Sequence, residues 1–149
     1  MKKANTLVLA SMLFLATTTP SRSIQSEREE IVKHASGTLI EQILDAAKID
    51  YSEVKQNVYS FKVRGYKAVI FVKPGDIQLY AVFTGRKITL NRINDWNREH
   101  RFSKAYLDND GDAALESDLD FDGGVTGATI GNFFALFARS IEAFSDHLK

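Results

Sequence analysis

The middle of the chain holds three consecutive segments with strand patterning that are separated only by tight-turn residues: 58–64, 66–73 and 77–83. Gly65 separates the first pair. Pro74-Gly75 separates the second pair and has the residue order of a type II turn. Connections this short join only antiparallel strands. The sequence therefore predicts an antiparallel meander, around which the remaining elements must pack.

Side-chain alternation predicts the place of each strand in a sheet. In the first segment Tyr59, Phe61 and Val63 share one face, opposite polar residues. Residues 68–71 of the second segment are apolar on both faces, as expected of a central strand. Residues 49–56, which precede the meander, are predicted to form a connector or an irregular strand.

An amphipathic helix is predicted over residues 38–48, where apolar residues repeat every four positions. Gly37 interrupts a longer repeat at a cost of about 1 kcal/mol relative to Ala. Residues 24–36 are therefore predicted to form a polar N-terminal arm, although Ser26 and Glu29 have the spacing of a capping box.

A second helix and two more strands are predicted after the meander. Thr89 can cap the helix, which extends to about Glu99. Strands follow over residues 102–107 and 112–121, and Asn109-Asp110-Gly111 between them is a type I′ hairpin signal.

The last helix is predicted to begin after Gly123-Gly124, with Thr126 as its cap. Its long core-facing stripe consists of Ile130, Phe133, Phe134, Phe137, Ile141, Phe144 and Leu148. The element order is then α-β-β-β-α-β-β-α, and the helices at both ends need an apolar surface to cover. The sequence predicts one α+β domain over residues 37–149, with two layers and a five-stranded antiparallel sheet.

Residues 89–125 also carry a family resemblance. The residues that carry it are Asn94-Asp95-Trp96-Asn97-Arg98-Glu99, Arg101-Phe102, Ala105-Tyr106-Leu107-Asp108, Gly111, Asp118-Leu119 and Gly123-Gly124-Val125. Their order resembles the YbjN-like family of bacterial proteins, which are described as sensory transduction regulators. The resemblance implies a fold similar to type III secretion chaperones and a non-enzymatic class, and it implies no reaction.

The first 23 residues have the layout of a secretory signal peptide. Lys2 and Lys3 form a positive segment, and residues 7–16 form an apolar stretch that is too short to span a bilayer. Residues 21–23 offer small side chains for cleavage after Ser23. An uncleaved amphipathic anchor is the alternative. The mature protein is expected to be periplasmic or secreted, without stable membrane insertion.

Composition narrows the function of the mature chain. Removal of residues 1–23 leaves 126 residues with 16 Lys or Arg and 19 Asp or Glu, a net charge of about −3. Nucleic-acid binding needs a basic footprint, so this charge argues against it. The chain has no Cys, which excludes a lipoprotein anchor, disulfides, thiol nucleophiles and thiolate zinc sites.

An acidic stretch raises the question of a metal site. Asp118, Asp120 and Asp122 match the first positions of an EF-hand loop, but Thr129 stands where the bidentate carboxylate belongs. A second acidic triplet has its glycine misplaced: Asp108, Asp110 and Asp112. We interpret both as a turn and the charged solvent face of an edge strand, with weak calcium binding as the alternative. No cofactor is predicted.

No catalytic constellation is recognisable in the sequence. The histidines, His34, His100 and His147, are far apart and lack a ligand spacing. The chain has no Gly-x-Ser-x-Gly elbow and no phosphate-binding glycine loop. The protein is therefore predicted not to be an enzyme.

One polar cluster is a candidate partner surface, and its members are Trp96, Asn97, Arg98, Glu99 and Arg101. Trp96 also falls on an apolar helix stripe, where a core role is the more common one. Six cations within residues 86–104 and seven acids within residues 108–122 either pair across the last two strands or form a bipolar surface that steers a charged partner.

Two functions remain open. The first is an exported, regulator- or chaperone-like module that binds a protein partner through a sheet edge or an apolar groove. Five phenylalanines in or just before the last helix, together with Leu136, supply more apolar surface than one helix face needs. This excess fits such a binding surface, with a homodimer interface, which the chaperone-like fold implies, as the alternative. The second function is a periplasmic protein that binds calcium or a small ligand through residues 108–122.

Overall fold

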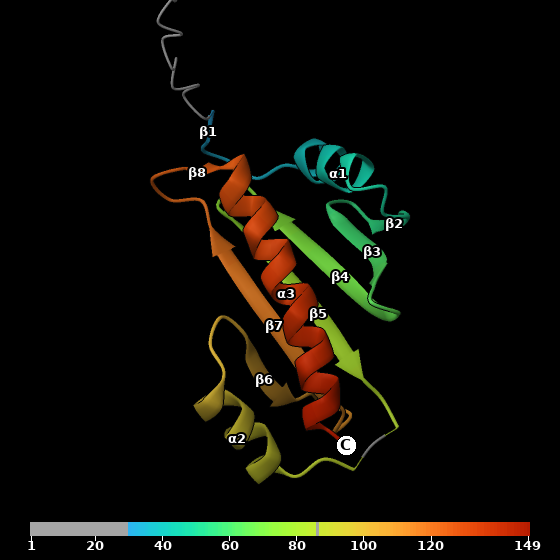
Figure 1. The fold of residues 1–149 in the computed structure, drawn as a ribbon. Helices are drawn as coiled ribbons and strands as arrows, with labels where there is room; N and C mark the ends of the chain where they lie inside the picture. Colours follow the sequence, from blue (N-terminus) through green and yellow to red (C-terminus); the bar gives the residue numbers. More distant parts are fainter. Residues whose placement is uncertain (1–29, 86) are drawn as a thin grey trace, which may run out of the picture.

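A six-stranded antiparallel sheet in the order β2-β3-β4-β5-β7-β6 forms one layer of the computed structural model, which describes residues 30–85 and 87–149 (Figure 1). Its strands are β2 (Tyr51–Lys55), β3 (Val58–Val63), β4 (Tyr66–Lys73), β5 (Asp76–Phe83), β6 (Lys104–Leu107) and β7 (Ala113–Asp120). The helices are α1 (Gly37–Ala46), α2 (Leu90–Glu99) and α3 (Gly127–His147). A separate two-stranded sheet consists of β1 (Ile31–Val32) and β8 (Val125–Thr126). The predicted α+β class and the meander are confirmed.

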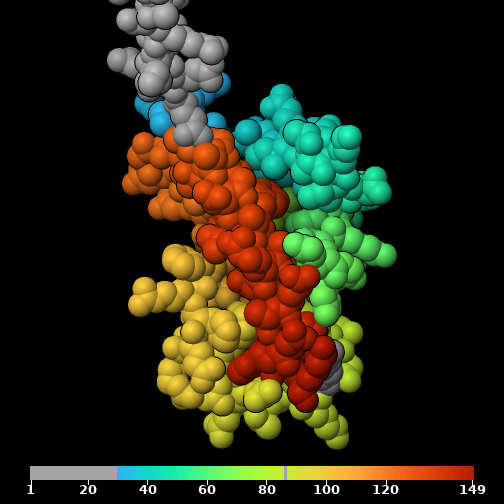
Figure 2. Space-filling model, in the orientation of Figure 1, coloured from blue at the N-terminus to red at the C-terminus, as the bar shows by residue number. Residues whose placement is uncertain are grey.

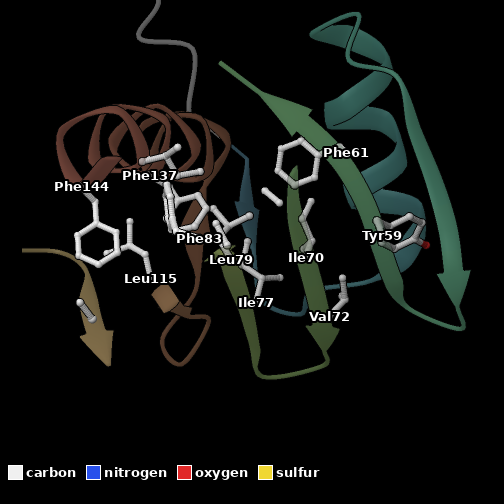
Figure 3. Close-up of a cluster of buried hydrophobic side chains, with 14 of the residues drawn as sticks. Tyr59, Phe61, Ile70, Val72, Ile77, Leu79, Phe83, Leu115, Phe137 and Phe144 are labelled. Carbon is white, nitrogen blue, oxygen red and sulfur yellow. The ribbon is translucent and has the colours of Figure 1, made fainter. Parts of the chain in front are cut away.

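One face of the sheet packs against helices α1 and α3. In Figure 1, α3 lies across β5 and β7, and α1 lies beside it towards β3. Figure 3 shows the side chains that fill the space between the layers. They include Tyr59, Phe61, Ile70, Leu79, Leu115, Phe137 and Phe144, all of which are buried. Each such side chain contributes about 1.5–3 kcal/mol of hydrophobic stabilisation, so this layer is the main source of stability.

No described helix covers the opposite face of the sheet, which we call the open face. Val69 and Phe71 of β4 point to it and are half-buried, as is Tyr80 of β5. The prediction that β4 lies inside the sheet is confirmed, because β4 pairs with strands on both sides. Its apolar residues on the open face are only half-buried, because no helix among the described residues lies over them.

The predicted number of five strands is wrong, because residues 51–55 form a sixth strand, β2, at the edge of the sheet. The turn into β3 is stabilised locally. Asn57 has a φ of 60°, and its N–H donates to Glu53 Oε1 at 2.9 Å. Most side chains of β2 are exposed, so the strand lacks the alternation that reveals half-buried strands.

Two predicted turn types are also wrong. A type I′ turn needs two successive residues with positive φ, and Arg64 and Gly65 provide them, with φ of 53° and 84°. At the predicted 109–111 turn only Gly111 has a positive φ. There the Asp108 carboxylate accepts the N–H groups of residues 110 and 112 and favours a different turn. Gly75 has no positive φ, so the Pro74-Gly75 turn is not type II.

The described part of the predicted polar arm is ordered by backbone pairing. Strand β1 pairs with β8, and the N–H of buried Ala35 donates to Pro74 O at 3.0 Å. Ser36 caps α1, so Gly37 begins the helix. A Cβ atom at Gly37 would collide with the Tyr59 hydroxyl, which explains the glycine. The predicted signal peptide and capping box lie outside the described residues.

The predicted helix caps are confirmed. Thr89 accepts the Arg92 N–H at 3.3 Å, and Thr126 accepts the Thr129 N–H at 3.1 Å. Five members of the predicted α3 stripe are buried, and Phe133 and Phe134 at its margins are half-buried. No helix within the described residues has the length and apolar character to cross a membrane.

Removal of a central aromatic ring tests the core. Phe144 is fully buried and contacts Phe83 and Trp96 at ring-centroid distances of 5.2 and 4.9 Å. We expect Phe144→Ala to lower the free energy of unfolding by about 3–5 kcal/mol, measured by urea denaturation, because it leaves a cavity. The exposed Leu90 provides the control, and Leu90→Ala should cost less than about 1 kcal/mol. Similar losses in the two variants would contradict this account of the core.

Alkaline pH tests the buried hydroxyl of β3. Burial and a hydrogen bond to Glu41 raise the pKa of Tyr59 from 10.0 to about 12. The unfolded chain therefore releases the Tyr59 proton at lower pH than the folded chain, so stability falls as pH rises from 10 to 12. In the Tyr59→Phe variant, the urea midpoint should fall less steeply between pH 10 and 12 than in the parent protein. The midpoint of each protein at about pH 8 is its reference. An equally steep decline in the variant would rule out Tyr59 as a source.

Candidate functional site

Trp96, the first member of the predicted partner surface, lies in the core with only 1% of its surface exposed. Its ring stacks on His100 with centroids 3.6 Å apart, and its indole N–H donates to Ser103 Oγ at 3.2 Å. His147 packs edge-on against the same ring. Trp96 therefore does not contribute directly to a surface, because α3 and the α2–β6 connection cover it.

The side chain of Asn97 closes the outer edge of β6. Its amide nitrogen donates to Ala105 O and its amide oxygen accepts the Ala105 N–H, both at 2.9 Å. Unpaired edge groups are a template for further strand pairing. Asn97 thus blocks pairing at the centre of this short edge strand.

The other three predicted surface residues are exposed at the end of α2. Arg98 pairs with Asp95 at 2.8 Å and lies 3.7 Å from Glu99. Arg101 follows the helix. The structure brings them together, and their role in partner binding remains a prediction.

The C-terminal half of β7 has an unpaired edge, because it extends past Lys104, the first residue of β6. Strand β6 pairs only with residues 113–116 of β7. Before β6, the chain is turned away at Phe102, whose φ is 66°. Its carbonyl accepts the Ser117 hydroxyl at 2.7 Å, which fixes the point where the chain departs from β7.

The free edge presents hydrogen-bonding groups in a defined direction. The Asn97 amide hydrogen-bonds the N–H and C=O groups of Ala105 on the side of β6 that faces away from β7. Ala105 and Leu115, which lie opposite each other, therefore exchange no backbone hydrogen bonds. The alternation of a strand then directs the N–H and C=O groups of Asp118 and Asp120 to the same side as those of Glu116. No strand or loop within the described residues pairs with that side of Asp118 and Asp120.

An apolar groove of about 310 Å³ lies beside this edge on the helix side of the sheet. In Figure 2 a recess at the left margin separates the golden α2–β6 region from the orange start of α3. The groove is lined by Phe102, Asp118, Leu119, Thr129, Asn132, Phe133 and Leu136. Phe102 is 72% exposed, so its ring forms an accessible wall of the groove.

The acidic residues are acceptors in turns and between strands. Asp118 accepts Gln78 Nε2 at 2.8 Å, and Asp120 accepts the Asp122 N–H at 2.8 Å. In the part of the chain that the structure describes, no three His, Asp or Glu side chains gather to hold a metal ion. The geometry therefore adds no support to the calcium alternative.

Glu116 differs from its acidic neighbours because its side chain is only 7% exposed on the open face. Lys104 forms an ion pair with it, and the Tyr106 hydroxyl donates to it at 2.8 Å. The hydrogen bond to Glu116 raises the pKa of Lys104. Burial, followed by the same carboxylate, raises the pKa of Tyr106 well above its usual range. This is the one cross-strand ion pair between the predicted cationic and acidic segments within the described residues.

The sequence did not reveal the free edge and its groove. It predicts one strand over residues 102–107, whereas β6 begins at Lys104. The difference depends on the positive φ of Phe102, which aromatic residues seldom adopt and which no pattern predicts. The small, polar Ser103 within the predicted strand was the one available signal of a break in the sequence.

The chain matches a known protein-family model. The model of the YbjN family, described as "Putative bacterial sensory transduction regulator", matches residues 36–149. None of the curated proteins matches the chain.

Substitution of Phe102 tests its strained backbone. A positive φ costs an L-residue about 1–2 kcal/mol, and glycine adopts it freely. We therefore expect Phe102→Gly to be at least as stable as Phe102→Ala in urea denaturation, with a gain of up to about 1 kcal/mol after glycine's larger entropy loss is subtracted. A clear loss of stability in the glycine variant relative to the alanine variant would show that residue 102 is not held at positive φ.

Proposed function

The chain belongs to the YbjN family, and we propose that it is a non-enzymatic, regulator-like module that binds an extended segment of a partner protein along β7. The observation that carries this proposal is the unpaired edge at Asp118 and Asp120 beside the groove of Phe102 and Leu136. An extended segment would continue the line of β6 and pair with these backbone groups. Its side chains on one face would enter the groove.

The other strand edges are less suited to this role. At β6, Asn97 occupies the backbone groups of Ala105. At β2 the register shifts between Glu53 and Lys55, and such a bulge discourages regular pairing. The β7 edge is continuous, and β6 already shows that it accepts an antiparallel neighbour.

The proposal includes a cellular location. If residues 1–23 direct export, the partner is a periplasmic or secreted protein, or the periplasmic part of a membrane protein. The sensory role in the family's description then requires such a membrane partner to carry a signal inward. Capture of an extended segment is also the activity expected of a chaperone-like module, so both descriptions share one mode of binding.

Selection from a library of random ten-residue peptides tests the proposal. We expect the purified protein to enrich peptides that it binds with measurable affinity in fluorescence anisotropy. Phe102→Gly and Leu136→Gln should each weaken this binding about 10-fold or more, because loss of an apolar contact at the centre of an interface costs at least about 1.4 kcal/mol.

Leu90→Gln is the matched control, because Leu90 is 65% exposed on α2 and lies outside the groove. It should leave the affinity unchanged. Failure to select any peptide, or selected peptides that bind both groove variants as well as the parent, would overturn the proposed function.

A further inference from the structure

We propose that the partner segment alternates cationic and apolar residues, an inference that rests on the proposed function. The two faces of the β7 edge differ in chemistry. Leu119 points to the helix side and lines the apolar groove, whereas Asp118 and Asp120 point to the open face. A strand paired with β7 must present alternate side chains to these two surroundings.

The apolar requirement comes from the groove. The residue of an added strand opposite Leu119 would point to the helix side, as Leu119 does. It would meet the side chains of Phe102, Phe133 and Leu136, which line the groove. An aliphatic or aromatic side chain at this position would remove those side chains from water.

The cationic requirement comes from the carboxylates on the open face. Asp118 and Asp120 are both exposed, and Asp76 lies opposite Asp120 on β5. Among the described residues, the cation paired with this group is Lys73, at 3.9 Å from Asp76. Residues of an added strand opposite Asp118 and Asp120 would lie on this face, where Lys or Arg relieves the repulsion between the acids.

Strand β6, which pairs with the neighbouring part of β7, already alternates a cation with an apolar residue. Lys104 lies opposite Glu116 and forms an ion pair with it on the open face. The next residue, Ala105, points to the helix side and is buried. The pattern of a cation followed by an apolar residue thus already fits β7, and an added strand would repeat it opposite Asp118, Leu119 and Asp120.

A second copy of the chain is a poorer occupant of this edge. Two β7 edges paired antiparallel about a two-fold axis would place the Asp118 and Asp120 carboxylates of one copy against those of the other. Like charges directly opposite each other destabilise a strand pair. The edge therefore disfavours its own copy and favours a basic segment.

Three synthetic peptides of equal length separate the inference from the proposed function. They alternate Leu with Lys, with Thr or with Glu, and their affinities for the purified protein are measured by fluorescence anisotropy at low salt. We expect the Lys peptide to bind about 3- to 10-fold more tightly than the Thr peptide, as two exposed ion pairs allow, and the Glu peptide to bind most weakly. The preference should shrink as salt is added.

The double variant Asp118→Asn with Asp120→Asn should abolish the preference for Lys over Thr. Asp50→Asn with Asp110→Asn is the control, because it changes the net charge equally at exposed carboxylates outside the groove. Equal binding of the Lys and Thr peptides would overturn the inference and leave the proposed function standing. Failure of all three peptides would count against both. Binding of the Lys peptide that survives Phe102→Gly would reveal non-specific attraction and overturn the inference.

Discussion

The packing of Phe144 on Trp96 and Phe83 joins the three parts of the structure that define the site. Phe83 ends β5, Trp96 belongs to α2, and Phe144 lies near the end of α3. Phe144 lies between the other two rings and contacts each of them in an edge-on arrangement. Because these contacts are buried, they fix α2 at the end of the sheet, and the position of α2 determines the path of the chain into β6.

The position of α2 determines which sheet edge has its backbone groups satisfied and which has them free. From this helix Asn97 reaches the backbone of Ala105, so the outer edge of β6 is satisfied by a side chain. The connection back to the sheet must reverse direction within a few residues. It does so through the positive φ of Phe102, which costs free energy that the surrounding packing offsets. Because of this turn, β6 begins only at Lys104, β7 is unpaired beyond Glu116, and the exposed Phe102 ring lies beside the free edge.

Local patterns predicted the elements whose ends are marked by neighbouring residues. Strand β4 has the predicted bounds because Gly65 and Pro74-Gly75 flank it, and Thr89 and Thr126 cap the predicted helices. Strand β2 was not recognised as regular because its side chains are mostly exposed on both faces. The apolar stripe of α2 favoured a core role for Trp96, and Trp96 is buried. Glu116 shows the other limit, because its burial depends on partners from β6 that the local sequence does not specify.

The acidic character of the β7 edge satisfies two physical requirements at once. An unpaired edge beside an apolar groove is an aggregation hazard, and charged side chains are a common protection against it. Asp118 and Asp120 supply that protection against other copies of the chain, since they would meet their own equivalents. The same charges leave the edge open to a segment of opposite charge. At the first residue of β6, Lys104 forms an ion pair with Glu116, whereas Asp118 and Asp120, beside the free backbone groups, form no ion pair with a described residue. Protection from self-association and the proposed selection of a basic partner therefore follow from a single arrangement of charge.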